Sequence, residues 1–276
     1  MRVYNTVSGI IVAEQDKYYL IPNKSWEEFI NNDDVFEHTR SQLPSLTTMK
    51  DLDLLRPPIG EGQELWACGV TYLRSKIGRE EESKTAGASD FYSRVYEAER
   101  PEVFFKATPH RVVAHGEQVN IRRDSEWNVP EPELTLVVST SGKIVGYTIG
   151  NDMSSRSIEG ENPLYLPQAK TYDGCAALGP CVLLTDKPID PATTIGLSIT
   201  RKDEKVFEGS VLVSQIKRKL EDLVSFVFRE SSFPNGCLIM TGTGIVPPNN
   251  FTLLPGDMVR IDIEGIGSLE NRVGYK

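Results

Sequence analysis

Three carboxylates stand close together in the sequence, in the stretch VPEPELTLVVSTSGKIVGYTIGNDMSSR (residues 129–156). Glu131 and Glu133 lie near its beginning, and Asp152 lies near its end. If the fold brings the three together, they repel one another unless a cation neutralises them. Carboxylate oxygens are hard ligands, which suit Mg²⁺ and also Mn²⁺ or Ca²⁺. The residues therefore predict a site for a divalent cation; the alternative is a group of ordinary surface acids.

A β-hairpin would bring these carboxylates together. Alternating apolar residues on both sides of Ser141 and Gly142 predict two strands joined by these two residues as a loop. In this register Glu131 lies opposite Asp152, with Cβ atoms about 4.5–5.5 Å apart. Glu133 lies two positions further along the same strand and so on the same face. All three carboxylates are expected to converge.

The two faces of the predicted hairpin differ in composition. One face carries small residues beside the carboxylates, Gly146 and Gly150, which predict a hollow there. Pro130 and Pro132 cannot donate backbone hydrogen bonds, so the first strand is expected to be frayed or at a sheet edge there. The other face is predicted to be a core face, and it carries Leu134, Leu136, Val138, Val145, Tyr147 and Ile149.

Several residues that can bind anions or move protons follow Asp152. Arg156 can hold a carboxylate through two parallel hydrogen bonds, and Lys170 can carry a proton. Glu159 and Gln168 lie between them in the chain. Each of these side chains alone would fit an exposed surface. Their concentration beside a predicted cation site favours functional roles.

Composition limits the classes of function. The chain has 276 residues, with 39% hydrophobic and 25% charged residues, as expected for a globular protein. A net charge of −9 argues against nucleic acid or an anionic membrane as a partner. No apolar run approaches the roughly 18 residues of a membrane-spanning helix, and the N-terminus does not resemble a signal peptide. The cysteines show no CxxC spacing, which favours reduced thiols in a cytoplasmic protein: Cys68, Cys175, Cys181 and Cys237.

Two domains are expected, residues 1–58 and residues 59–276. The first contains two short strands in SGIIVAEQDKYYLIP and one helix in SWEEFINNDDVFEHTRSQL, where Ser25 and Glu28 form a capping-box pattern. The link RPPIGEGQE separates it from a second, β-rich domain with a further helix in SQIKRKLEDLVSFVFRES. Residues 78–99 are polar and charged, which predicts a mobile cover rather than core.

Six motifs in this order resemble the fumarylacetoacetate hydrolase superfamily: EPE, GYTIGNDMSSR, QAK, ALGP, TGTG and GDMVRIDIEGIGSLEN. The resemblance covers about residue 60 to residue 275. It implies an α+β, β-rich fold, a rolled mixed β-sheet with the small N-terminal α/β unit attached, assembled as a homodimer or homotetramer. It also implies that Glu131, Glu133 and Asp152 hold Mg²⁺ or Ca²⁺.

The resemblance further implies roles for residues around the ion. Lys170, the lysine after the metal-binding aspartate, contacts the substrate or moves a proton. Arg156 and Thr243 are expected near the substrate, and Lys106 in FFKA borders the site.

One segment departs from the superfamily pattern. Hydrolases commonly carry G-x-N-Y-x-x-H-x-x-E, whose His–Glu pair activates water, whereas this chain has GVTYLRSKIG. Thr71, Ser75 and Gly78 replace the asparagine, histidine and glutamate, and Ser75 is predicted to contact the substrate. Without an imidazole base, hydrolysis of a C–C bond is harder to justify. Surface or structural roles are expected for the histidines, which are His38, His110 and His115.

Longer stretches such as RRDSEWNVPEPELTLVV and TGTGIVPPNNFTL resemble the sugar-acid dehydratase branch. That branch implies Mg²⁺-dependent dehydration of a 2-keto-3-deoxy sugar acid in pentose catabolism, namely 2-keto-3-deoxy-D-arabinonate to 2,5-dioxopentanoate. Lys170 is the first choice for the proton carrier, a water held by Glu159 is the second, and Gln168 is expected to bind substrate. The alternatives are an acylpyruvate hydrolase, an oxaloacetate decarboxylase or a non-catalytic metal-binding module.

Overall fold

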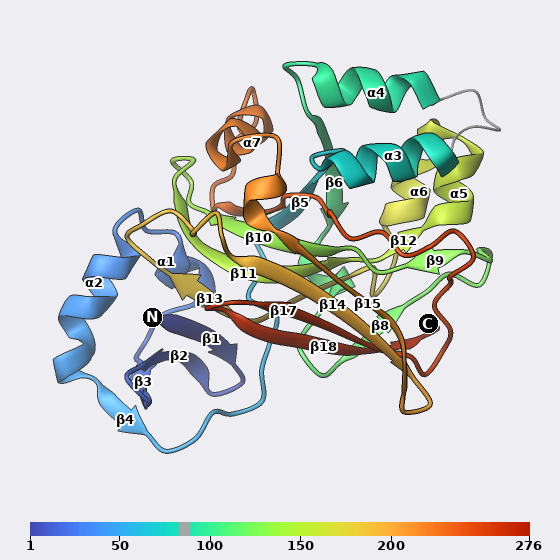
Figure 1. Ribbon diagram of the computed structural model, residues 1–276. Coiled ribbons are helices and arrows are strands. Elements are labelled where there is room, and N and C mark those ends of the chain that lie inside the picture. Colours follow the sequence, from blue (N-terminus) through green and yellow to red (C-terminus); the bar gives the residue numbers. More distant parts are fainter. Residues whose placement is uncertain (83–88) are drawn as a thin grey trace.

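The computed structural model describes residues 1–82 and 89–276, and it describes side chains outside residues 82–90. Two β-sheets dominate the fold (Figure 1). The larger sheet has eleven strands, ordered β4 (Thr47–Met49), β3 (Lys17–Ile21), β2 (Gly9–Glu14), β1 (Arg2–Thr6), β13 (Ala176–Leu184), β11 (Ile144–Asp152), β10 (Pro132–Val138), β16 (Cys237–Met240), β5 (Glu64–Gly69) and β6 (Glu102–Ala107), with β7 (Val112–Val113) beside β13.

The smaller sheet is ordered β15 (Glu204–Leu212), β14 (Thr194–Arg201), β17 (Met258–Ile263), β18 (Gly267–Gly274) and β8 (Gln118–Asn120), and β9 (Asn128–Val129) pairs with β12 (Ser154–Ser155). The α-helices are α1 (Trp26–Ile30), α2 (Val35–Gln42), α3 (Leu73–Glu82), α4 (Ser89–Glu97), α5 (Arg156–Glu161), α6 (Leu166–Lys170) and α7 (Leu220–Val227). Parallel pairs, β16 with β5 and β13 with β7, interrupt an otherwise antiparallel larger sheet. The predicted β-rich fold with a mixed sheet is confirmed.

Two hydrophobic cores lie on opposite faces of the larger sheet. Leu136 belongs to the core between the two sheets, together with residues of β14, β17 and β18. Val137, the next residue of β10, belongs to the second core, which Trp26 and Phe29 of α1 cover. Successive residues of a strand face opposite sides, so a strand with a core on each side is apolar throughout.

The hairpin register at the carboxylate end is confirmed. Glu133 pairs with Gly150, and the backbone N–H of Asp152 donates to the carbonyl of Glu131 at 2.9 Å. The predicted loop is wrong, because Ser139 N donates to the Lys143 carbonyl and the loop therefore starts at residue 140.

A β-bulge near the tip accounts for the difference in the loop. Gly142 has φ +84°, as expected for the left-handed glycine of a longer loop with an extra residue. The bulge turns Val145 into the second core and brings Ile144 against the first. The predicted placement of Val145 on the face of Leu136 is therefore wrong.

The hairpin end that carries the prolines is paired on one side only, as expected of a frayed or edge position, although further along β10 is an interior strand between β11 and β16. Pairing with β16 begins only at Thr135. The two prolines, which have no N–H, therefore cost the sheet no hydrogen bond to β16. The predicted glycine hollow is filled: a Cβ at Gly150 would lie 2.8 Å from Met240 Cε, and one at Gly146 would lie 2.6 Å from Val182 Cγ1.

The first 58 residues add strands to the larger sheet, since β1 pairs with β13. Ser25 and Glu28 form the predicted capping box of α1. The single helix expected after Ser25 is wrong, because α1 ends at Ile30 and α2 begins at Val35. The intervening NNDD residues bond locally, as when Asn32 Oδ1 accepts from Asp34 N, and such bonds compete with a helix. The domain division at residue 58 stays a prediction.

Helices α3 and α4 occupy part of the segment predicted to be a mobile cover. Residues 83–88 of that segment lie outside the described residues, and its mobility stays a prediction. The later helix begins at Leu220, after a 3-10 turn at Val213–Gln215, rather than near Ser214. Within the described ranges, no helix is both long and apolar enough to span a membrane.

Candidate active site

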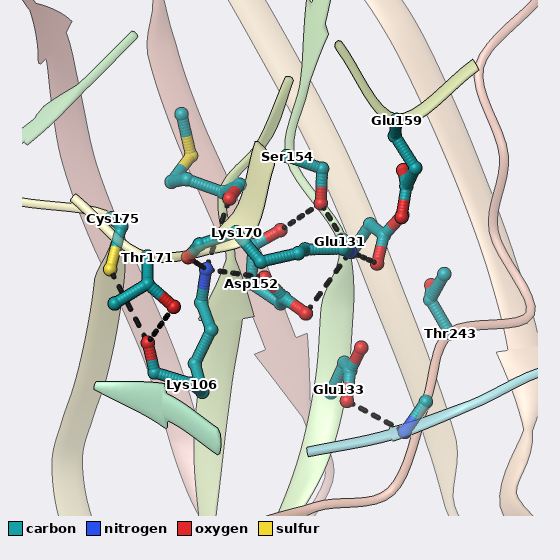
Figure 2. A network of polar contacts seen from close by, with 12 residues as sticks. Lys106, Glu131, Glu133, Asp152, Ser154, Glu159, Lys170, Thr171, Cys175 and Thr243 are labelled. Carbon is teal, nitrogen blue, oxygen red and sulfur yellow. Dashed lines mark hydrogen bonds and ion pairs between the residues drawn. The ribbon is translucent and has the colours of Figure 1, made fainter. Parts of the chain in front are cut away.

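Glu131, Glu133 and Asp152 converge at the open end of the β10–β11 hairpin. One oxygen from each carboxylate lies within 4.8 Å of the others, and all three residues are buried. Glu131 immediately precedes β10, and Asp152 ends β11. The strand register therefore produces the predicted cluster (Figure 2).

Lys170 links two of these carboxylates. It ends α6, and its Nζ donates to Glu131 Oε2 at 2.7 Å, to Asp152 Oδ2 at 3.2 Å and to the hydroxyl of Ser154. Figure 2 shows this ammonium between the two acids. The other oxygen of Glu131 accepts from Arg156 Nη2 at 2.6 Å. A carboxylate with two cationic donors is held in one orientation.

Lys106 holds the other side of Asp152. Its side chain is 0% exposed, and its Nζ lies 2.7 Å from Asp152 Oδ1. The same ammonium donates to the backbone carbonyls of Met153, at 3.1 Å, and of Lys170. Burial alone would raise the pKa of Asp152, but the charges of Lys106 and Lys170 lower it below its usual value. Asp152 is therefore a stable carboxylate, and Lys106 positions it.

Glu133 differs from the other two carboxylates in its surroundings. Its Oε2 accepts from the backbone N–H of Gly242 at 2.6 Å. Gly242 has φ +92°, and a Cβ there would overlap the hydroxyl of Thr71, so this close backbone approach requires glycine. Burial raises the pKa of Glu133 well above its usual value, and the charges of Asp152 and Glu131 raise it further. A cation would remove this penalty.

Two helices close the site from the other side. Arg79 on α3 forms a buried ion pair with Glu159 on α5, and Arg156 Nε lies 3.9 Å from the second oxygen of Glu159. Ser75 does not replace the missing histidine chemically. Its hydroxyl accepts from the Tyr72 N–H and donates to the Tyr72 carbonyl, so it stabilises the first turn of α3.

These residues enclose a small cavity. Its volume is about 10 Å³, on the order of the space one water needs, so a sugar acid can bind only if side chains move. The cavity is lined by Cys68, Gly69, Val70, Ser75, Arg79, Phe104, Glu131, Glu133, Asp152, Arg156, Lys170, Gly242 and Thr243.

The neighbours of two lining residues, Cys68 and Thr243, determine what these side chains can do. Burial raises the pKa of the Cys68 thiol, and Glu133 and Glu102 raise it further, so this thiol is not a nucleophile at neutral pH. Thr243 is buried, and its Oγ1 accepts from the Ile245 N–H at 3.2 Å, which fixes the loop after Gly242.

Four residues considered in the sequence lie elsewhere. Gln168 is exposed and is absent from the described cavity lining. His38 and His110 are exposed. His115 accepts from the Glu270 N–H through Nδ1 at 3.1 Å, which is a structural contact.

Two residues near the site were missed in the sequence, Arg79 and Glu102. Glu102 and Phe104, which lines the cavity, share one face of β6, because strand residues alternate. A register shift opposite Leu65 and Trp66 separates them from Lys106. No local pattern indicates Arg79, because its place depends on how α3 packs over the sheet.

Comparison with known families defines the class of protein. The model of the fumarylacetoacetate (FAA) hydrolase C-terminal family matches residues 79–274, and this chain belongs to that family. Its three carboxylates lie within the matched region.

Among the individual relatives and solved structures are named sugar-acid dehydratases. A probable 2-keto-3-deoxyxylonate dehydratase of Haloferax volcanii is 50% identical over 214 residues, covering 77% of this chain and 73% of the relative. A 2-dehydro-3-deoxy-D-arabinonate dehydratase of Saccharolobus solfataricus is 39% identical over 265 residues, covering 95% and 88%. A solved structure of 2-keto-3-deoxy-D-arabinonate dehydratase complexed with magnesium and 2,5-dioxopentanoate has a TM-score of 0.84 at 33% identity, covering 100% of this chain and 99% of that chain.

Proposed function

We propose that this protein is a Mg²⁺-dependent hydro-lyase that converts 2-keto-3-deoxy-D-arabinonate to 2,5-dioxopentanoate in pentose catabolism. The observation that carries the proposal is the Lys170 ammonium, buried between Glu131 and Asp152. It joins a proton carrier to a cation site, and no histidine is present among the described residues that line the cavity. The named dehydratases among its relatives support the same reaction class.

The three carboxylates fit Mg²⁺. They supply hard oxygen ligands within 4.8 Å of one another, and the buried Glu133 has the raised pKa expected of a carboxylate without sufficient positive charge nearby. Bound there, Mg²⁺ would polarise the 2-oxo group of the substrate and make its C3 protons more acidic. Mn²⁺ and Ca²⁺ offer the same ligand preference and remain alternatives to be compared with Mg²⁺.

The remaining residues bind the substrate and move protons. Arg156 and Thr243 border the cavity and suit the substrate's C1 carboxylate, since a guanidinium and a hydroxyl can both donate to it. In its neutral amine form Lys170 takes a proton from C3, and loss of the C4 hydroxyl as water leaves an unsaturated 2-oxo acid that tautomerises to the aldehyde. This route needs no hydrolytic water, which agrees with Ser75 standing in place of the hydrolase histidine.

Incubation with Mg²⁺ and 2-keto-3-deoxy-D-arabinonate tests the proposal. Mass spectrometry should detect a product that retains all carbons and has lost one water. Acylpyruvate and oxaloacetate serve as comparison substrates. Release of pyruvate from these at ordinary enzymatic rates, with the sugar acid unchanged, would favour a hydrolase or decarboxylase instead.

We further propose a cytoplasmic homodimer or homotetramer. All four cysteines are buried free thiols, which suits a reducing compartment. Large exposed apolar side chains, such as Leu164 and Phe91, support burial against another subunit. Light scattering of the purified chain would give the number of subunits.

A further inference from the structure

Thr71, which stands where hydrolases of the superfamily carry asparagine, lies in the turn between β5 and α3. It is 0% exposed, and its hydroxyl donates to the backbone carbonyl of Thr241 at 2.6 Å. Its own carbonyl accepts from the Lys217 N–H at 3.0 Å. Thr71 therefore joins its turn to the loop after β16 and to the segment before α7.

One peptide group connects Thr71 to a candidate metal ligand. The Thr241 carbonyl accepts from Thr71, and the N–H of the same peptide unit, at Gly242, donates to Glu133 Oε2 at 2.6 Å. A peptide unit is planar, so a bond that fixes its carbonyl also fixes the direction of its N–H. A hydrogen bond to the carbonyl also polarises the N–H and makes it a stronger donor. The Thr71 hydroxyl thus acts on Glu133 through one rigid group.

The loop that contains this peptide is held from two sides. A Cβ at Gly242 would overlap the Thr71 hydroxyl and lie 2.9 Å from the Cys68 carbonyl, so the turn and the loop are in direct contact. On the other side, the N–H and the hydroxyl of Thr241 both donate to the Leu134 carbonyl, at 3.0 and 2.8 Å. The peptide therefore lies between the turn that carries Thr71 and the strand that carries Glu133.

Val70, the residue before Thr71, has a strained backbone. Its φ is +53°, in the left-handed region that β-branched residues rarely adopt, and it is buried. Such residues persist where their surroundings fix them, and they cluster at functional sites. Val70 lines the cavity. The turn conformation that directs Thr71 to Thr241 is therefore strained and borders the candidate active site.

We propose that Thr71 is a positioning residue for the divalent cation, an inference that rests on the metal site of the proposed function. Its hydroxyl fixes the Thr241–Gly242 peptide, and the peptide holds Glu133 in one orientation before the ion binds. Glu131 and Asp152 are oriented by cationic side chains, whereas this backbone N–H orients Glu133. Partners that orient metal ligands in this way typically contribute about 10- to 100-fold to metal affinity.

Calorimetric Mg²⁺ titration of matched threonine variants tests this role. Thr71→Val removes the hydroxyl, keeps the side-chain shape and should weaken Mg²⁺ binding about tenfold. Thr71→Ser keeps the hydroxyl and should bind Mg²⁺ as the wild type does. Thr135→Val is the matched control, because Thr135 is equally buried, shares the strand face of Glu133, and its hydroxyl has no hydrogen-bond partner among the described residues. It should leave the affinity unchanged.

A second measurement needs no ion. In the metal-free protein, NMR with isotope-labelled glycine should show the Gly242 amide proton at lower frequency in Thr71→Val than in the wild type, because its hydrogen bond to Glu133 is weakened. Thr71→Ser and Thr135→Val should leave this signal in place. Thr71→Ala, which also removes the hydroxyl, takes the place of Thr71→Val in both measurements if valine prevents folding.

Three results would contradict the positioning role. Mg²⁺ affinity unchanged in Thr71→Val, or lowered equally in Thr135→Val, would overturn it and leave the metal site of the proposed function intact. A lowered affinity with an unmoved Gly242 signal would also overturn it, since the effect would then bypass the peptide. A wild-type protein that binds no Mg²⁺ would instead overturn that metal site, and the positioning role with it.

Discussion

The sheet side and the helical side of the site hold their charged residues in different ways. On the sheet side, pairing of β10 with β11 fixes Glu131 relative to Asp152, and β6, which carries Lys106, joins them through β16 and β5. On the helical side, an ion pair between side chains, Arg79 with Glu159, joins α3 to α5. Backbone ladders open only with the sheet, whereas two side chains can separate while their helices stay folded. We therefore expect the cation site to be the more rigid of the two and a substrate to enter from the helical side.

The largest effect is expected at the junction of the two sides, from Lys170→Ala. Loss of the proton carrier should slow dehydration by about 10²- to 10⁴-fold. Steady-state assays with 2-keto-3-deoxy-D-arabinonate measure the change, and Lys143→Ala, at an exposed lysine of the hairpin, is the control. Residual activity near the wild-type level would remove Lys170 from the mechanism.

On the sheet side, Glu133→Gln should weaken Mg²⁺ binding by about 100-fold or more, because the charged ligand is replaced by a neutral amide. The protein without Mg²⁺ should unfold at the same temperature or higher, since the change removes a buried, poorly neutralised acid. Calorimetric titration and thermal unfolding measure the two effects. Unchanged Mg²⁺ affinity would contradict the assignment of Glu133 as a ligand.

On the helical side, Arg79→Met should lower the free energy of unfolding by about 2 kcal/mol. This is less than the roughly 3–5 kcal/mol for breaking a buried ion pair, because Arg156 still lies near Glu159. A second change, Glu159→Gln, should restore most of the loss by removing the uncompensated charge. Urea unfolding of the single and double variants tests this, and equal stability of the two would show that the ion pair is not what joins the helices.

The pH dependence of Mg²⁺ binding should report on the sheet side alone. Burial and neighbouring carboxylates raise the pKa of Glu133, so the ion-free protein keeps this proton to a higher pH than usual. Mg²⁺ must displace the proton, and its affinity should fall as pH decreases below that pKa, by up to about tenfold per unit. Titration in buffers of different ionisation enthalpy counts the released protons. A pH-independent affinity between about pH 5 and 8 would contradict the raised pKa.

The smallest effect should appear in hydrogen exchange of α3 and α4. If these helices cover the site, Mg²⁺ with a 2-oxo acid should slow their amide exchange several-fold and leave β10 and β11 nearly unchanged. Mass spectrometry of peptides from both regions compares the two sides in one experiment. Equal protection with and without ligand would show that the helices do not act as a cover.

The two sides also differ in how far the sequence predicted them. Period-two alternation predicts which residues of a hairpin share a face, so Glu131, Glu133 and Asp152 could be grouped from sequence alone. The one-residue bulge before Ile144 could not be predicted from sequence, because it depends on the backbone geometry at Gly142. It lies far enough from the carboxylates to leave their register intact.

Helical packing left no comparable signal in the sequence. Arg79 reaches the site because α3 packs against α5, which carries its ion-pair partner Glu159, and local residue patterns do not encode that packing. Gln168 was predicted to bind substrate, but it is absent from the described cavity lining. It is near Lys170 in the chain, but the short helix α6 turns the two side chains to different sides, one exposed and one buried.

The pairing of β1 with β13 has a consequence for how the chain can be shortened. β13 lies between β1 and β11, the strand that carries Asp152. Removing the first 58 residues would leave the N–H and C=O groups of Leu184 without their hydrogen bonds to Met1, along an apolar strand. Open edges of this kind recruit strands from other molecules. The N-terminal strands thus protect the sheet against aggregation.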